Sequence, residues 1–253
     1  MMRNWKFILP LLLATAPAAL EAAPADVAAA VSAKARPAAA VKLDESRKPV
    51  DVLRFLGLEK GDRALDLLTG SGYYAEIMAR AVGPQGAVVA WEPANFYDEA
   101  AKKGWAELSG RAPNARLLVS TAKELALAPS SFDFVLMHMI YHDAYWESEK
   151  YKFPRMDPAA FLQTVFAATK PGGIVGVVDH VAEPGGDTRQ VADKLHRIDP
   201  AVIRADFEKA GFVFDGESDL LRNRSDDRSK LVFDPSVRGK TDRVVYRFRK
   251  PAA

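Results

Sequence analysis

Short apolar runs alternate along the chain with longer stretches in which apolar residues recur at helical spacing. The runs predict strands over residues 63–68, 87–91, 116–119, 134–140 and 174–179. The intervening stretches predict helices over residues 47–56, 73–82, 95–108, 161–169 and 201–210. Strands that alternate with helices of this length are typical of crossover units in a parallel sheet, and largely apolar strands indicate burial on both faces.

Two further strands, over residues 212–214 and 244–248, end the pattern. The chain is therefore predicted to form an α/β fold with a doubly wound, seven-stranded sheet. Such sheets bind ligands in the crevice at the carboxyl ends of their strands. We expect four acids there, because each ends or closely follows a predicted strand: Asp66, Glu92, Asp143 and Asp179.

The first 45 residues do not follow this pattern. Basic residues precede an apolar run over residues 7–20, and Ala23-Pro24-Ala25 fits the cleavage site of a signal peptide, with a cut after Ala22 as an alternative. The run is shorter than the ~20 residues of a membrane-spanning helix; a short uncleaved anchor or a buried helix are the other interpretations. The sequence thus predicts a signal peptide over residues 1–25, an alanine-rich linker over 26–45 and one domain over 46–253; a marginal helix over residues 26–41 is the alternative to a linker there. We expect a periplasmic or secreted protein without a stable membrane anchor after cleavage.

The composition excludes several classes of function. The 253 residues include no cysteine, which rules out disulfides, thiolate zinc sites, iron–sulfur clusters and cysteine nucleophiles. The 35 Lys and Arg nearly balance the 33 Asp and Glu, whereas dedicated nucleic-acid binders carry a basic excess. We therefore expect a small-molecule substrate and no nucleic-acid partner.

A glycine-containing loop joins the first strand to the next helix. Gly70 and Gly72 allow a tight turn and a close approach of ligand to backbone, and the helix start presents free N–H groups. Glu92 ends the second strand 20 residues after Gly72, where a carboxylate can accept hydrogen bonds from both ribose hydroxyls. Loop and acid together predict a site for an adenosine-containing cofactor.

Two cofactors fit such a site. The segment from Gly70 to Ala75 matches the G-x-G-x-x-G/A pattern of dinucleotide-binding loops. Asp66 favours another ligand, because its carboxylate repels a pyrophosphate but can hold the positively charged amino-acid end of S-adenosylmethionine.

Several motifs resemble, in order, those of class I S-adenosylmethionine-dependent methyltransferases. They are Asp66 to Gly72, Glu92, Ser131-Phe132-Asp133-Phe134-Val135 and Lys170-Pro171-Gly172-Gly173. More narrowly, Gly72-Tyr73-Tyr74, Tyr141-His142-Asp143, Asp179-His180, residues 195–199 and residues 238–242 resemble a bacterial group of predicted methyltransferases that often carry export signals. Leu68 and Thr121 depart from the family pattern, in which a glycine and an acid are usual.

The resemblance implies a Rossmann-like, mostly parallel seven-stranded sheet that ends in an antiparallel hairpin, with S-adenosylmethionine as the cofactor. It assigns cofactor binding to Asp66, Gly70, Gly72, Tyr73 and Glu92. It also places the segment after the fourth strand at the methyl end of the cofactor.

That segment holds the candidate catalytic residues Tyr141, His142 and Asp143. His142 is the candidate general base, because the unperturbed pKa of histidine lies near neutrality. His142, His180 and His196 can also converge with a carboxylate on zinc or iron. No tight spacing such as H-x-x-x-H supports this, so the sequence predicts no metal and gives His180 and His196 hydrogen bonds to loop backbone. His138, inside the fourth strand, is predicted to be a satisfied core histidine.

The leading hypothesis is a methyltransferase with an unknown small acceptor. The alternative is a non-catalytic ligand-binding protein on the same fold, which Leu68 and Thr121 favour; a nicotinamide-dependent oxidoreductase and a metal-dependent hydrolase are further hypotheses. Residues 145–154 form either a substrate lid or a solvated loop with aromatic anchors. The charges of residues 220–242 nearly cancel, which predicts a self-paired ionic network rather than an anion site.

Overall fold

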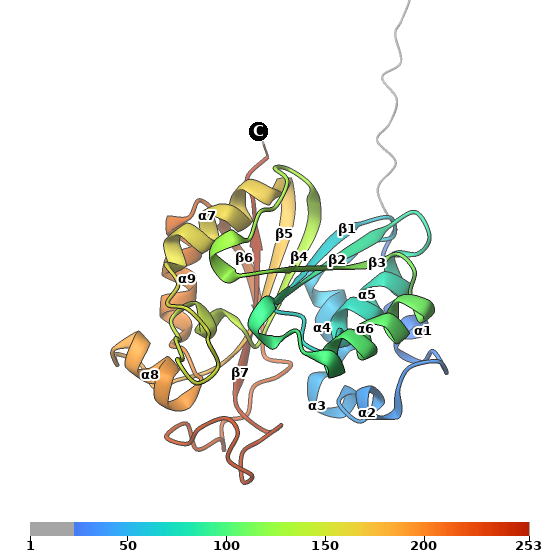
Figure 1. The fold of residues 1–253 in the computed structure, drawn as a ribbon. Helices are drawn as coiled ribbons and strands as arrows, with labels where there is room; N and C mark the ends of the chain where they lie inside the picture. Colours follow the sequence, from blue (N-terminus) through green and yellow to red (C-terminus); the bar gives the residue numbers. More distant parts are fainter. Residues whose placement is uncertain (1–22, 253) are drawn as a thin grey trace, which may run out of the picture.

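A seven-stranded sheet forms the centre of the molecule in the computed structural model, which describes residues 23–252 (Figure 1). Its strands are β1 (Arg63–Leu67), β2 (Ala87–Pro93), β3 (Ala115–Ser120), β4 (Phe132–His138), β5 (Thr169–His180), β6 (Val213–Ser218) and β7 (Arg243–Arg249). Their order is β3-β2-β1-β4-β5-β7-β6. Strands β1 to β5 pair in parallel, whereas β7 is antiparallel to both β5 and β6. The predicted fold, including the closing hairpin, is confirmed.

The position of β7 separates this sheet from dinucleotide-binding folds. In those folds the strand order is 3-2-1-4-5-6, with all crossovers of one kind. Here the last strand enters between β5 and β6 in the opposite direction. The strand order therefore counts against the nicotinamide-dependent oxidoreductase.

Helices cover both faces of the sheet. They are α1 (Val27–Val31), α2 (Ala38–Val41), α3 (Asp44–Arg47), α4 (Pro49–Leu56), α5 (Tyr73–Val82), α6 (Glu99–Arg111), α7 (Pro158–Ala168), α8 (Thr188–Leu195) and α9 (Pro200–Lys209), with 3₁₀ turns η1 (Ala94–Phe96), η2 (Ala122–Glu124) and η3 (Tyr141–Ala144). Helices α4, α5 and α6 enclose one hydrophobic core, and α7 and α9 enclose a second on the opposite face. None of the helices within residues 23–252 is long and apolar enough to cross a membrane.

Capping residues explain where many helices begin. An aspartate carboxylate accepts a hydrogen bond from a backbone N–H of the first turn at α1, α6, α7, α8 and α9. Pro158 and Pro200 then occupy the first helical position, where the missing N–H costs nothing.

Several predicted elements have different bounds in the structure. The helix predicted over residues 47–56 is divided, because Lys48 adopts a left-handed φ of 44° and Pro49 starts α4. The helix predicted from residue 95 starts at Glu99, since Asp98 provides the cap. Residues 171–173, predicted to break a helix, lie in β5, and α8 occupies a segment predicted to be loop.

The alanine-rich segment before the domain is packed against it. Residues 26–45, predicted to be a linker or a marginal helix, contain short helices, and the side chains of Val27 and Ala30 are buried in the core beside α5. Arg36 is also buried and forms an ion pair of 2.7 Å with Asp44. The segment therefore extends the domain rather than leading away from it.

Most of the predicted signal peptide, residues 1–22, lies outside the described residues. The next three residues run beside residues 58–60, with the N–H of Ala25 donating to the carbonyl of Leu58 at 3.1 Å. Ala25 itself is buried. Of the two predicted cleavage positions, the one after Ala22 leaves these contacts in place.

Candidate active site

A polar pocket of 220 Å³ opens at the carboxyl end of β1, beside the glycine loop. Its walls include Asp66, the loop itself, Arg47 from α3 and His138 and Met139 from the end of β4. Glu92, at the end of β2, accepts a hydrogen bond of 2.7 Å from the N–H of Gly70. The structure thus brings together the loop and the two acids that the sequence predicts there.

The two glycines of the loop serve different purposes. Both have positive φ, 57° at Gly70 and 77° at Gly72. A Cβ on Gly72 would lie 2.4 Å from Leu108 Cδ1 and 3.0 Å from Trp105 Cζ2, so helix α6 packs on this residue. A Cβ on Gly70 would meet no atom within 4 Å. Gly72 therefore permits the packing of α6, and Gly70 keeps space open beside the pocket.

Leu68, where the family usually has glycine, also adopts a left-handed φ, of 51°. The departure from the family pattern is thus accommodated by the same backbone turn, at the strain that a side chain brings to this region. It leaves Gly70 and Gly72 as the two glycines of the loop.

Both acids are nearly buried; Asp66 lines the pocket, whereas Glu92 contacts the loop through the N–H of Gly70. Asp66 is 3% exposed and accepts a hydrogen bond of 2.6 Å from the Thr69 hydroxyl. Burial raises the pKa of Asp66 to about 7, although Thr69 and Arg47 act in the opposite direction. Burial likewise raises the pKa of Glu92 to about 7, against the effect of the Gly70 N–H. Two such carboxylates are suited to a ligand that brings hydroxyl donors and a positive charge.

Two aromatic side chains at the start of α5 complete this pocket. The ring of Tyr73 lines it, but its hydroxyl donates to Asp44 at 2.6 Å, and the Arg47 guanidinium lies 4.4 Å from its ring centre. Tyr74 packs against His138 with ring centres 4.5 Å apart. Tyr73 can therefore offer a ligand its ring rather than its hydroxyl.

His138 differs from its prediction. It is buried, as expected, but within the described part of the chain its Nε2 has no hydrogen-bond partner. The residue lines the polar pocket instead of being satisfied in the core. Burial holds the pKa of this ring well below its usual range, so the ring is neutral.

A second pocket, of 340 Å³, adjoins the first and shares Met139 with it. We call it the aromatic pocket. Its lining comprises Phe96, Met139, His142, Asp143, Trp146, Tyr151, His180, His196, Val232 and Phe233. These residues come from η1, from the segment after β4, from the end of β5, from the end of α8 and from the long connection between β6 and β7. Sequence reasoning singled out the histidines but not Phe96, Met139 or Phe233, which no local motif marks.

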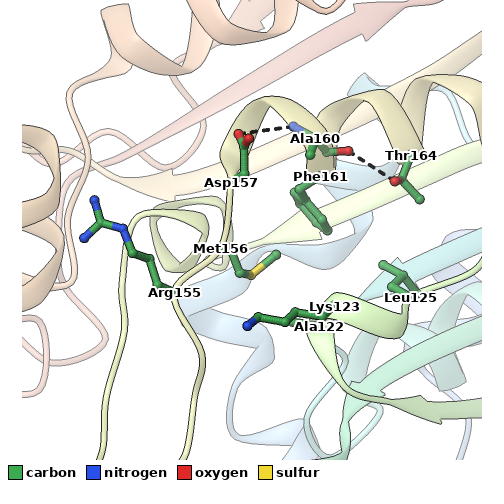
Figure 2. Close-up of a pocket in the computed structure, with 9 residues that line it drawn as sticks. All are labelled: Ala122, Lys123, Leu125, Arg155, Met156, Asp157, Ala160, Phe161 and Thr164. Carbon is green, nitrogen blue, oxygen red and sulfur yellow. Dashed lines mark hydrogen bonds between the residues drawn. The ribbon is translucent and has the colours of Figure 1, made fainter.

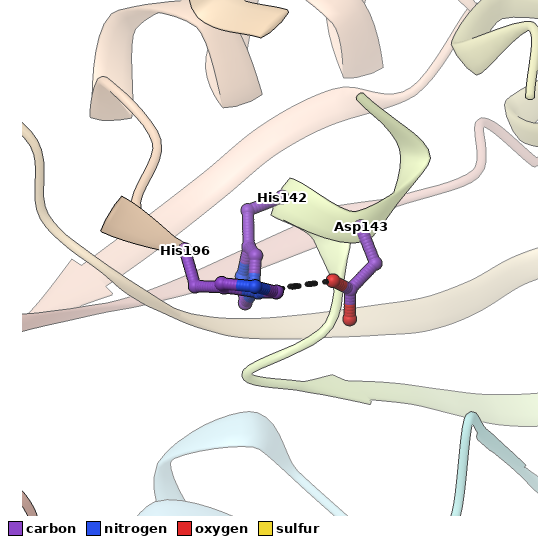
Figure 3. A group of neighbouring side chains, drawn as sticks. All are labelled: His142, Asp143 and His196. Atoms are coloured by element: carbon purple, nitrogen blue, oxygen red, sulfur yellow. Dashed lines mark hydrogen bonds and ion pairs between the residues drawn. The ribbon is translucent and has the colours of Figure 1, made fainter. Parts of the chain in front are cut away.

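The aromatic pocket has His142 at its base. His142 is 3% exposed, and its Nδ1 lies 2.7 Å from an oxygen of the fully buried Asp179, whose other oxygen accepts the His142 backbone N–H. Its Nε2 faces Asp143 and His196 (Figure 3). Burial lowers the pKa of His142, but Asp143 and Asp179 together raise it more, to about 9. In this setting the ring holds its proton at neutral pH and is not a free base.

The other predicted residues are placed as follows. Tyr141 is fully buried, and its hydroxyl donates to Asp206 at 2.7 Å, so it packs beneath α9 and does not line the aromatic pocket. His180 Nδ1 lies 2.7 Å from the Thr241 hydroxyl rather than near loop backbone. His196 joins His142 and Asp143 instead of a backbone group.

The connection between β6 and β7 forms the ionic network that the sequence predicts. Arg197 pairs with Asp226 at 2.6 Å with both side chains fully buried, and Arg222 and Arg228 both pair with Asp242. This network holds the segment that carries Phe233 over the aromatic pocket. In the insertion over residues 145–154, Trp146 is a buried anchor, whereas the role of the insertion as a lid stays a prediction.

A third cavity, also of 340 Å³, lies apart from this site (Figure 2). Its lining comes from η2, from residues 155–157 and from α7. The described connection between β3 and β4 contains the short turn η2 and no α-helix, which leaves this hollow beside α7. None of its lining residues belongs to either of the two adjoining pockets.

Comparisons with known proteins agree with the geometry. Residues 64–173 match the family model described as a methyltransferase domain. The demethylmenaquinone methyltransferase of Geobacillus kaustophilus is 30% identical over 125 residues, which cover 49% of this chain and 47% of that protein. The corresponding enzyme of Staphylococcus aureus strain Newman is 32% identical over 84 residues, 33% of each chain. The chain thus matches about half of the length of its curated relatives, or less.

Solved structures share the fold. A methyltransferase from Aquifex aeolicus superposes with a TM-score of 0.57 at 21% identity, covering 84% of this chain and 98% of that one. The [4+2]-cyclase SpnF superposes with a TM-score of 0.59 at 18% identity, covering 94% and 89%. These structures show that the chain has the methyltransferase fold, and the family match over residues 64–173 supports a class I S-adenosylmethionine-dependent methyltransferase domain there. The cofactor of that class is S-adenosylmethionine.

Proposed function

We propose that the chain transfers a methyl group from S-adenosylmethionine to a small aromatic acceptor. The observation that carries this proposal is the pair of adjoining pockets that share Met139. The pocket at the glycine loop is polar and acidic, whereas the second is lined by aromatic rings and histidines. Such an arrangement holds two different ligands with one point of contact between them, and positioning supplies much of the acceleration in a displacement reaction.

The residues of the polar pocket fit the cofactor. Glu92 would accept hydrogen bonds from the ribose, Asp66 would face the positively charged amino-acid end, and Gly70 leaves room for both. When bound, S-adenosylmethionine supplies a methyl group on a positively charged sulfur. The chain itself orients the acceptor toward this group and keeps water out of the pocket.

The lining of the aromatic pocket supports an aromatic acceptor. Phe96, Trp146, Tyr151 and Phe233 offer ring faces for stacking. The volume of 340 Å³ lies at the small end of the range for small-molecule sites. The names of the curated relatives, demethylmenaquinone methyltransferases, also point to a ring compound.

Calorimetric titration of the untagged protein with S-adenosylmethionine and S-adenosylhomocysteine tests the cofactor. We expect micromolar binding that weakens by roughly 10- to 100-fold in Glu92→Ala, the range for a lost hydrogen bond to a charged group. Glu99→Ala is the matched control, because Glu99 lies exposed on α6, away from the pocket. A folded protein that binds neither compound at millimolar concentration contradicts the proposal.

A second assay separates an enzyme from a non-catalytic binding protein. The protein is incubated with S-adenosylmethionine labelled in its methyl group and with a panel of phenols and naphthoquinols. A labelled product that is absent with Glu92→Ala supports methyl transfer. Cofactor binding without any labelled product across the panel favours the binding protein.

Export is proposed separately, on the basic and apolar residues at the start of the chain. The contacts of residues 23–25 with residues 58–60 favour cleavage after Ala22. The N-terminal sequence of the protein recovered after expression with its full leader tests this. A chain that begins at Ala23 is the expected result, and a chain that retains Arg3 contradicts it.

A further inference from the structure

Three side chains direct their ligand atoms at one point in the aromatic pocket (Figure 3). His142 Nε2 lies 3.3 Å from His196 Nδ1 and 3.4 Å from Asp143 Oδ1, and His196 Nδ1 lies 3.5 Å from the same oxygen. The three atoms form a nearly equilateral triangle, which we call the His–Asp triangle. All three are good ligand atoms for a transition metal.

The size of the triangle matches a tetrahedral metal ion. Zinc binds histidine nitrogen at about 2.0–2.1 Å and carboxylate oxygen at about 2.0–2.2 Å, with tetrahedral angles. These bond lengths place neighbouring ligand atoms roughly 3.3–3.5 Å apart. The three separations in the triangle fall in this interval. An octahedral magnesium ion, at about 2.0–2.1 Å, needs a smaller triangle and prefers oxygen ligands and water.

The surroundings of His142 hold its ring in the orientation that a metal requires. A carboxylate only accepts hydrogen bonds, so the contact of 2.7 Å with Asp179 keeps one proton on Nδ1, and a metal that displaces the second proton, from Nε2, meets a lone pair there. Asp179 is itself fixed by the backbone N–H groups of His142 and His180. Histidine ligands of metals characteristically donate their other ring N–H to a carboxylate in this way.

The ring of His196 is also fixed in position. His196 ends α8 with a left-handed φ of 49°. Its ring centre lies 5.0 Å from that of Trp146 and 5.1 Å from that of Phe233. Packing on two aromatic neighbours from separate segments restricts the ring to the orientation that completes the triangle.

We propose that His142, Asp143 and His196 hold a divalent transition-metal ion of the zinc type, with an open coordination position that faces the aromatic pocket. Catalytic zinc sites have three protein ligands and leave the fourth position to water or substrate. His180 stays outside the triangle, because its Nδ1 is engaged by Thr241. In this arrangement His142 acts as a ligand instead of a general base.

The open position assigns a ligand class to the aromatic pocket. An acceptor with a hydroxyl on its ring can stack on the aromatic side chains while its oxygen binds the metal, which lowers the pKa of a bound hydroxyl. This second statement rests on the proposed methyltransferase function. The binding of the metal does not.

Metal titration of the untagged, chelator-treated full chain tests the site. We expect one equivalent of Zn²⁺ by calorimetry and a visible absorption band when Co²⁺ is added. Asp143→Asn and His196→Gln should each weaken Zn²⁺ binding at least about 100-fold, and Asp179→Asn about 10- to 100-fold. The matched controls are His138→Gln, a buried histidine outside the triangle, and Asp227→Asn, an exposed carboxylate; both should keep the stoichiometry.

Two results overturn the site: no binding of Zn²⁺ or Co²⁺ by the folded protein, or stoichiometric binding that survives both Asp143→Asn and His196→Gln. Circular dichroism checks the folding of each variant, and the nearly isosteric Asp143→Asn keeps the test decisive if His196→Gln does not fold. Addition of a naphthol to the Co²⁺ protein should shift the absorption band. An unchanged band contradicts the open position.

The S-adenosylmethionine affinity measured on the same samples separates this inference from the proposed function. Asp143→Asn should leave that affinity within about 2-fold, because the triangle lies outside the polar pocket. Binding of Zn²⁺ without binding of S-adenosylmethionine supports the metal site and contradicts the methyltransferase. Binding of S-adenosylmethionine without binding of Zn²⁺ supports the methyltransferase and contradicts the metal site.

Discussion

The two adjoining pockets of this domain are built in different ways. The polar pocket is lined mainly by one short stretch, residues 66–74 at the end of β1 and the start of α5, and Glu92 at the end of β2 binds this loop at Gly70. The aromatic pocket draws on five separate segments, from η1 near residue 96 to Phe233 in the connection before β7. Parallel crossovers impose the first, whereas the second depends on how distant loops pack. The fold therefore prescribes the polar pocket and leaves the aromatic pocket free to vary.

Alanine at each glycine of the loop is expected to have the largest effect on stability. In Gly72→Ala, strain at a φ of 77° adds about 1–2 kcal/mol, and the clash with Leu108 and Trp105 adds about 1–3 kcal/mol. We expect the free energy of unfolding to fall by about 2–5 kcal/mol, as measured by chemical denaturation. Gly70→Ala carries the strain alone, and should lose about 1–2 kcal/mol.

Cofactor affinity should separate the same pair of variants. Gly70 lines the polar pocket. Gly70→Ala should therefore weaken S-adenosylmethionine binding even though its loss of stability is the smaller of the two. Equal losses of stability in the two variants would show that α6 does not depend on Gly72 as the structure indicates.

The buried acid Asp66 should make the free energy of unfolding of the protein depend on pH. Its pKa of about 7 in the folded protein lies above the usual 3.8, so the folded state binds more protons between these values. The contribution of Asp66 to stability is therefore present below pH 4 and is lost as the pH rises through about 7. Each unit of pKa difference corresponds to about 1.4 kcal/mol.

Asp66→Asn removes this dependence. We expect the variant to exceed the wild type in stability at pH 8, on the order of a few kcal/mol, and the difference to disappear near pH 4. Denaturation across this range provides the measurement, with Asp51→Asn, an exposed position on α4, as the control. If the wild type is instead more stable than the variant at pH 8, the interactions of the ionised Asp66 carboxylate outweigh the cost of its burial, which contradicts the prediction.

The smallest effect concerns the rim of the aromatic pocket. Phe233 is 53% exposed, so Phe233→Ala should leave stability nearly unchanged. Loss of one stacking face should raise the KM for an aromatic acceptor about 2- to 10-fold, with the affinity for S-adenosylmethionine unchanged. Leu231→Ala, 37% exposed in the same connection, is the control. A change in cofactor affinity would show that the two pockets are not separate in function.

The contrast between the pockets also explains what could be read from the sequence. β1, α5, β2 and the position of Glu92 follow from local periodicity and from a loop motif with fixed spacing, and the structure has them at nearly the predicted bounds. The closing hairpin follows from the resemblance to a family. These features depend on neighbours in the sequence.

The aromatic pocket could not be derived in this way. His142 and His196 are separated by 54 residues, and only the position of α8, predicted to be loop, brings them to 3.3 Å. The prediction that His138 has its hydrogen bonds satisfied is wrong. The environment of its ring depends on Arg47 and Tyr74 from other elements, which the local sequence does not reveal. Tyr141 follows the fourth strand as closely as His142 does, yet its side chain points to Asp206. Adjacent positions in a 3₁₀ turn point in different directions, and sequence order alone does not say which one faces a ligand.

The central proposal is that the polar pocket binds the cofactor and the aromatic pocket binds the acceptor. A crystal structure of the protein with S-adenosylhomocysteine tests this most directly. We expect the ribose hydroxyls at Glu92, the amino-acid end at Asp66 and the sulfur toward Met139, with the aromatic pocket left open. S-adenosylhomocysteine bound instead in the aromatic pocket, or in the cavity beside α7 shown in Figure 2, would contradict it.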